Sequence, residues 1–131
     1  MSMAPLSEAD RSVLRQQITA AIAAHHGWMG KLKTAADFGR SSLDVTTTAK
    51  EDACPVGAWL TGGISPALRA TPLYTRTRAL HARFHREAAR ILTLALARDP
   101  RARTELAEGG AFAGIAGELR HALNEWLRAA D

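Results

Sequence analysis

The sequence predicts an all-α protein, an up-and-down four-helix-type bundle with a short helical turn that carries the cysteine. Alanine, leucine and arginine dominate the composition while valine, isoleucine and aromatic residues are few, which favours helix over strand. Apolar residues recur at three- and four-residue steps along three long segments. The chain of 131 residues has the length of one domain, so we expect a single domain over residues 1–131 with a core at about 6–127.

The composition also limits the classes of function. No apolar run approaches 18 residues and no signal-peptide pattern opens the chain, so we expect a cytoplasmic protein without a membrane span. The net charge of +4 comes mostly from arginine, and four of the arginines recur every seventh residue along one segment. Acidic residues elsewhere balance this stripe, so we interpret it as a solvated face and expect no nucleic-acid binding. The stripe consists of Arg69, Arg76, Arg83 and Arg90.

The first long helix is predicted from about Pro5 to Phe38. Ser7 is a suitable N-cap, and acidic Glu8 and Asp10 fall in the first turn, where they favour the helix dipole. One face of this helix is apolar over its whole length. Its members are Leu14, Ile18, Ala21, Ile22, His25, Trp28, Met29, Leu32 and Ala36.

His25 lies within that apolar face, whereas His26 points about 100° away and is expected at the surface. A buried histidine needs partners for its ring nitrogens. Two interpretations of His25 therefore stand: a hydrogen-bonded core residue, or a metal ligand that gives one nitrogen to the ion and the other to a carbonyl or carboxylate.

The only cysteine begins a short helical turn, Cys54 to Leu60. The residues from Gly39 to Thr47 predict a loop. Thr48 and Glu51 have the spacing of a capping box for a short helical turn. Pro55 suits the first helical position, so Cys54 is expected at the helix N-terminus, where a thiolate is favoured. Gly57 would let the turn pack closely on another helix. The alternative is that Cys54 is a small buried apolar residue.

The second long helix is predicted from Pro72 to about Arg98, with Thr71 as its N-cap. His81 and His85 are four residues apart and project from the same face, which makes half a metal site. A third long helix is predicted from about Arg101 to Ala130, loosened or kinked at Gly109 and Gly110. His121 on that helix has polar neighbours and is expected to be exposed.

Together these residues offer three imidazoles and one thiolate, the donors that a tetrahedral Zn²⁺ site prefers. A site closed by four protein ligands favours a structural or sensing role over hydrolysis, because catalytic zinc keeps one position for water or substrate. Copper, cobalt and nickel accept the same donors. An enzyme would need an open metal position and a general base such as Glu51, Asp52 or Glu87. We therefore expect no enzymatic activity. The predicted metal ligands are His25, Cys54, His81 and His85.

The run His25-x-x-Trp28, Cys54-x-Val56-Gly57-x-Trp59 and His81-x-x-x-His85 resembles the signature of the chemoreceptor zinc-binding (CZB) domain family. The resemblance covers about Leu6 to Leu127 and implies a helical bundle whose zinc is held by those three histidines and the cysteine. It also implies a homodimer, and a chemoreceptor or diguanylate cyclase as signalling partner. Ala58 stands where many relatives carry lysine, which alters the charge beside the thiolate.

The resemblance further implies a sensory or regulatory domain that responds to zinc availability, or to oxidation of Cys54 by an agent such as hypochlorous acid. Loss of one ligand would free the cysteine turn and rearrange the helices. The alternative is a structural-zinc interaction module with no sensing role. Metal exchange separates the two, because a sensor must lose or gain metal under a condition met in cells.

Overall fold

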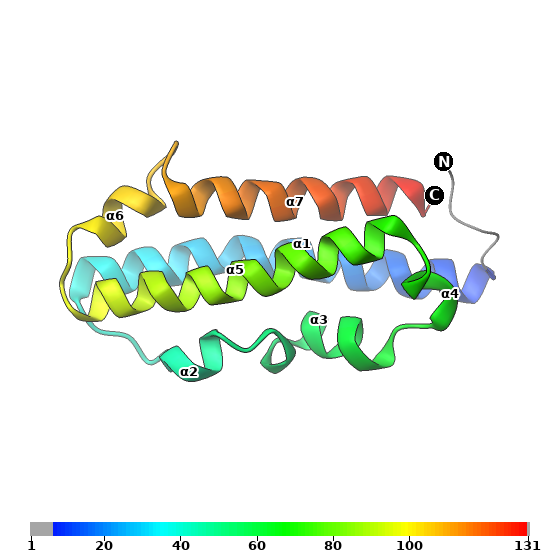
Figure 1. Ribbon diagram of the computed structural model, residues 1–131, viewed down its shortest axis with the longest axis horizontal. Helices are drawn as coiled ribbons and strands as arrows, with labels where there is room; N and C mark the ends of the chain where they lie inside the picture. Colours follow the sequence, from blue (N-terminus) through cyan, green and yellow to red (C-terminus); the bar gives the residue numbers. More distant parts are fainter. Residues whose placement is uncertain (1–6, 131) are drawn as a thin grey trace.

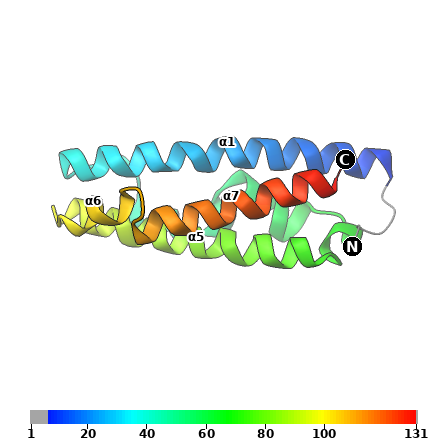
Figure 2. The ribbon, with the colours of Figure 1, turned by 90° about the horizontal axis from the view of Figure 1, so that it is seen from above.

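The computed structural model describes residues 7–130, and over that range the chain forms helices and no strand. Three long helices lie side by side; the first two run in the same direction and the third runs in the opposite direction (Figures 1 and 2). They are α1 (Glu8–Phe38), α5 (Pro72–Leu96) and α7 (Ala111–Ala129). The short elements that connect the first two long helices run back along the bundle, so the four parts alternate up and down in chain order. A chain of short elements fills the fourth position of the bundle, so the predicted all-α, four-helix-type architecture is confirmed. No helix among the described residues is long and apolar enough to cross a bilayer.

The fourth position consists of α2 (Val45–Thr48), the 3₁₀ turn η1 (Glu51–Ala53), α3 (Pro55–Ala58) and the π-helical turn η2 (Trp59–Gly63). We call residues 45–63 the short segment. At the two ends of the bundle, α4 (Pro66–Arg69) and α6 (Arg101–Leu106) turn the chain into the next long helix (Figure 1).

The ends of α1 follow from local chemistry. The backbone N–H of Asp10 donates to Ser7 Oγ at 3.0 Å, so Ser7 is the predicted N-cap. The predicted start near Pro5 lies outside the described residues. Gly39 ends the helix in the left-handed region at φ 68°, and its N–H donates to Ala35 O at 2.8 Å. The buried face is Leu14, Ile18, Ala21, His25, Leu32 and Ala35, while the other predicted members are half-buried.

The short segment departs from the sequence prediction at its start. The predicted loop ends earlier than Thr47, because Asp44 Oδ2 accepts hydrogen bonds from the Thr47 N–H at 2.8 Å and from its hydroxyl at 2.9 Å and so begins α2. The predicted capping box of Thr48 and Glu51 is wrong, since Thr48 lies inside α2 and is not an N-cap. Cys54 does occupy the N-cap position of α3, with Pro55 next, as predicted.

Helix α5 begins as predicted, with Thr71 Oγ1 accepting from the Tyr74 N–H at 3.2 Å. It ends two residues before the predicted Arg98, which itself adopts a positive φ of 58°. The single helix predicted for residues 101–130 is two helices. The expected loosening at the glycine pair is a complete break, because Gly109 adopts φ 83° and Gly110 caps α7.

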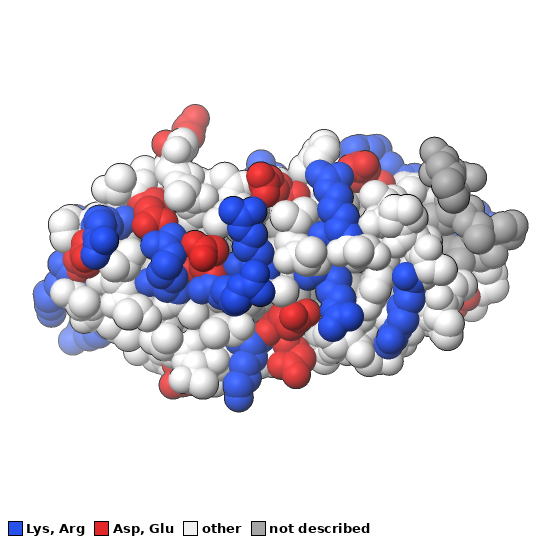
Figure 3. Space-filling view, in the orientation of Figure 1, with Lys and Arg blue, Asp and Glu red and all other residues white. Residues whose placement is uncertain are grey.

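The core is built from the facing sides of the long helices, with Trp126, Phe84 and Phe112 among its largest fully buried side chains. The arginine stripe lies outside this core on α4 and α5, and three of its members pair with glutamates. Arg76 contacts Glu125 at 2.9 Å, Arg83 contacts Glu118 at 3.6 Å, and Arg90 pairs with Glu87 and Glu105. Basic and acidic side chains therefore alternate over this face (Figure 3), as expected for a solvated surface.

Candidate metal centre

Four side chains from three parts of the chain converge inside the bundle. One comes from the middle of α1, one from the start of α3, and two from successive turns of α5. Their nitrogen and sulfur atoms all lie within 4.8 Å of one another, and all four residues are buried. The structure thus brings together the residues that the sequence singled out. We call them the four-donor cluster: His25, Cys54, His81 and His85.

Three of the six separations within the four-donor cluster are close to the edges of a metal tetrahedron. His85 Nε2 lies 3.4 Å from His25 Nε2 and 3.2 Å from His81 Nε2, and Cys54 Sγ lies 3.9 Å from His25 Nε2. Nitrogen and sulfur ligands at zinc bond lengths are separated by roughly 3.3–3.6 Å in tetrahedral geometry. The donors therefore need only small shifts to bind a common ion.

Hydrogen bonds at the far side of two imidazoles fix which nitrogen faces the cluster. His25 Nδ1 donates to Ala21 O at 2.8 Å, and His85 Nδ1 donates to Thr48 O at 3.1 Å. Because a carbonyl only accepts, Nδ1 carries the proton in each neutral ring and Nε2 presents a lone pair. Two lone pairs then face each other at 3.4 Å. Such an arrangement favours a cation between them.

Burial keeps the three imidazoles neutral, the form that binds metal. It lowers the pKa of His25 to about 4, an effect that the hydrogen bond to Ala21 O partly opposes. It lowers the pKa of His81 to about 3, with the neighbouring histidines adding to the shift. Burial likewise lowers the pKa of His85.

Gly57 allows the cysteine turn to approach α5. A Cβ at this position would overlap the main-chain oxygen of Glu51 and would lie 2.9 Å from His81 Cε1. The close contact predicted for Gly57 is therefore present, and it lies against one of the donor histidines. The other nitrogen of that ring, His81 Nδ1, is buried and has no hydrogen-bond partner within residues 7–130.

Aromatic rings surround the donors and anchor the cysteine turn. The Phe84 ring lies 5.1 Å from the His25 ring, and the Trp28 ring lies 5.7 Å from the His85 ring. On the turn itself, Trp59 packs on Trp126 at 6.1 Å between ring centroids. This apolar surrounding limits water around the centre and strengthens its electrostatic interactions.

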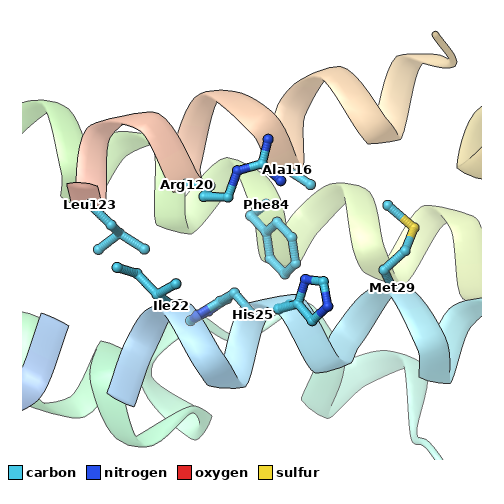
Figure 4. A pocket seen from close by; sticks show the side chains of 8 residues that line it. Ile22, His25, Met29, Phe84, Ala116, Arg120 and Leu123 are labelled. Atoms are coloured by element: carbon cyan, nitrogen blue, oxygen red, sulfur yellow. The ribbon is translucent and has the colours of Figure 1, made fainter. Parts of the chain in front are cut away.

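Two hollows reach the four-donor cluster from different sides. The first, of about 150 Å³, lies between α1 and α7, and we call it the α1–α7 pocket (Figure 4). The second, of about 350 Å³, lies beside α2 and has Cys54 and His85 at its inner end; we call it the α2 cleft. The α1–α7 pocket is lined by Ile22, His25, His26, Met29, Phe84, Ala116, Arg120 and Leu123. The α2 cleft is lined by Trp28, Ser42, Leu43, Asp44, Thr47, Thr48, Lys50, Ala53, Cys54 and His85.

The remaining histidines lie outside the centre, as predicted. His26 is exposed, and His121 is exposed beside Glu125 at 3.7 Å. Sequence reasoning did not identify the carbonyl partners of the donor histidines. Ala21, four residues before His25 on the same helical face, was open to identification from spacing, whereas Thr48 is 37 residues from His85 and only the fold brings it near.

Comparison with known proteins gives one match. A family model described as the chemoreceptor zinc-binding domain matches residues 25–92. This span begins at the first donor histidine and contains the whole four-donor cluster. No curated protein matches the chain, and no solved structure matches it either.

Proposed function

The chain belongs to the chemoreceptor zinc-binding domain family, and we propose that it is a regulatory domain that holds one Zn²⁺ through the four-donor cluster. The observation that carries this proposal is the convergence of four buried donors within 4.8 Å of one another, with two Nε2 lone pairs facing each other. Bound zinc supplies a cation that joins the three elements from which these donors come.

The chain's own residues prepare this site. The carbonyls of Ala21 and Thr48 hold two imidazoles in the tautomer that presents Nε2. Gly57 allows the cysteine turn to reach α5. Four protein donors leave no position for substrate water, which supports a regulatory domain over a hydrolase. Two of the three acids considered as general bases have other contacts: Glu51 lies 3.8 Å from Arg78, and Glu87 pairs with Arg90.

Metal analysis tests the proposed site. Protein purified from metal-replete cells should carry about one zinc per chain, given four ligands for one ion. His85→Ala should lose most of that zinc, while His26→Ala, which removes an exposed histidine next to a donor, should retain it. Wild-type protein that contains no zinc and takes none up on titration would refute the proposal.

We further propose that oxidation of Cys54 releases the metal. The thiolate sulfur would give two electrons to hypochlorous acid and gain its oxygen, forming a sulfenic acid while chloride leaves. A sulfenic acid is a poorer zinc ligand than a thiolate, so the cysteine turn would detach from α1 and α5. The α2 cleft supports this step because it reaches Cys54.

Oxidant-triggered release distinguishes the thiol from other oxidisable groups. Wild type should release zinc on addition of hypochlorous acid, and Cys54→Ala should bind zinc more weakly and show no triggered release. Met29→Leu is the matched control, because Met29 lines the pocket next to His25 and is also oxidisable. A response that persists in Cys54→Ala would exclude the cysteine as the switch.

A structural zinc site is the second candidate, favoured by the burial of the cluster: both α5 histidines are only 1 % exposed. A structural site would keep its metal under oxidant and against micromolar chelator, whereas a sensor would exchange it.

We also propose, from the resemblance, that residues 1–131 form one cytoplasmic domain that dimerises and regulates a chemoreceptor or diguanylate cyclase. Sedimentation with and without zinc tests the dimer.

A further inference from the structure

The four-donor cluster is nearly closed to solvent, so metal exchange requires a route. His81 and His85 are each 1 % exposed, His25 is 7 % and Cys54 is 9 % exposed. The α1–α7 pocket and the α2 cleft each reach part of the cluster. The chemistry of their linings differs, and this difference decides between them.

The α1–α7 pocket is unfavourable for a metal cation. None of the side chains that line it carries an oxygen atom: they include apolar groups such as Ile22 and Phe84, and Arg120 adds a permanent positive charge (Figure 4). A divalent cation would lose its hydration there without gaining oxygen contacts. Its two main walls are long helices packed along the bundle, so widening it would disturb the core.

The α2 cleft is more than twice as large, and its lining is richer in oxygen atoms. Ser42 and Thr47 contribute hydroxyls, and Asp44 contributes a carboxylate whose Oδ2 caps α2. Lys50 places one opposing positive charge in the same lining. A hydrated cation can exchange water for such oxygen atoms as it moves inward.

The inner end and the outer wall of the α2 cleft also suit metal exchange. Cys54 lies at the inner end and is the most exposed of the four donors. The outer wall consists of α2, η1 and the loop before them. The two helical elements have only four and three residues, so this wall can move without breaking a long helix.

We propose that the metal centre exchanges its ion through the α2 cleft, with the Asp44 carboxylate attracting the cation at the mouth and Cys54 as the first ligand reached. This inference rests on the proposed zinc site. It adds a kinetic role for residues that do not bind the metal in its final position.

Blocking the cleft tests the route. Ser42 is exposed and lines the cleft, so Ser42→Trp should fill part of it while leaving the four donors in place. We expect zinc uptake by the metal-free chain, and zinc release to an excess of chromophoric chelator, to slow by the same factor of tenfold or more. Because a barrier on the route raises both activation energies equally, the zinc content and the affinity should be unchanged. Ala116→Leu, which fills the smaller α1–α7 pocket, is the matched control and should change neither rate.

A second test changes the charges that line the α2 cleft and does not depend on blocking it. Asp44→Asn removes the carboxylate charge but keeps a good N-cap for α2, so uptake at low ionic strength should slow about threefold, as expected for loss of electrostatic attraction. Lys50→Gln should accelerate uptake by a similar factor. Both effects should diminish at 0.5 M salt, where exposed charges are screened.

The outcomes separate this inference from the zinc site itself. Slower exchange in Ala116→Leu but not in Ser42→Trp would assign the route to the α1–α7 pocket and overturn the proposal. Unchanged rates in both variants, together with no charge effect, would mean that exchange occurs by wider opening of the bundle and would also overturn it. Absence of zinc uptake by wild type would instead refute the zinc site, and the proposed route with it.

Discussion

The long helices and the short segment hold the metal centre in different ways. Three donors lie on α1 and α5, which pack along their length through fully buried side chains such as Leu14 and Ile91. The fourth donor, Cys54, lies in a run of elements only three to five residues long. Hydrogen bonds from side chains of α5 to backbone carbonyls attach that run: Tyr74 Oη donates to Leu60 O at 2.8 Å, and His85 Nδ1 donates to Thr48 O.

This difference assigns separate roles to the two regions. Isolated helices of four residues are unstable, so the short segment depends on its attachments to α5 and, in the proposed zinc form, on the Cys54 ligand. The long helices have their own packed core. Loss of metal should therefore act first on the short segment, and the predictions below test that separation.

Metal removal should give the largest effect. At a free zinc concentration of about 1,000 times the dissociation constant, zinc adds about 4 kcal/mol to the free energy of unfolding, and a chelator removes it. Hydrogen exchange should show the greatest loss of protection in residues 45–63, and little change at Leu92 or Trp126. Equal loss of protection throughout the bundle would contradict two regions of different stability.

Lower pH should reduce the free energy of unfolding of the metal-free chain through the three buried histidines on α1 and α5. Burial lowers the pKa of His25 to about 4 and of His81 to about 3, and it also lowers the pKa of His85. Between the unfolded pKa near 6.5 and these values, the unfolded chain binds protons that the folded chain excludes. The free energy of unfolding should thus fall with pH, by up to about 1.4 kcal/mol per pH unit for each histidine.

Denaturant titrations of the metal-free chain between pH 7 and pH 5 measure this loss. His26→Gln should leave the slope unchanged, because His26 is exposed. In zinc-loaded protein, protons compete with the metal for the same nitrogens, so release should also increase as the pH falls. A stability that is constant from pH 7 to pH 5 would contradict buried neutral imidazoles.

Gly57→Ala should displace the short segment from α5. The added Cβ would overlap the Glu51 carbonyl oxygen and press on His81, with a cost of about 3 kcal/mol or more. Zinc affinity should fall with it, as isothermal titration can measure. Gly27→Ala is the control: nothing lies within 4 Å of its Cβ on α1, so it should raise stability by up to about 1 kcal/mol. Wild-type affinity in Gly57→Ala would show that the turn need not approach so closely.

The same two regions differ in how far the sequence predicts them. Helical periodicity predicts α1 and α5 and the inward side of His25, because a long amphipathic pattern repeats one signal many times. In the short segment, the N-cap at Cys54 follows from Pro55, but α2 depends on a single Asp44 cap that the loop composition concealed. The break between α6 and α7 was also underestimated, since a glycine pair indicates weakness without stating whether the helix ends.

The candidate site was predictable as a set of residues and not as a geometry. Donor type and i,i+4 spacing select the histidine pair, the apolar face of the first helix adds His25, and the helix N-terminus adds Cys54. The resemblance to a zinc-binding family indicates the same four residues. The 3.1 Å contact of His85 with Thr48 O and the two hollows depend on how distant segments pack. No local pattern carries that information.

Tyr74→Phe should give the smallest effect and the most selective one. The change removes one hydroxyl and leaves the buried Leu60 carbonyl without its donor, at a cost of about 1–2 kcal/mol. Because this bond attaches the short segment, the cost should appear in its opening, and zinc release to excess chelator should accelerate roughly 5- to 30-fold. Ile91→Val, in the long-helix core, has a similar cost of about 1 kcal/mol but should leave the release rate near that of wild type. Equal acceleration in the two variants would mean that the bundle opens as one unit, and metal release would then report global unfolding instead of movement of the cysteine turn.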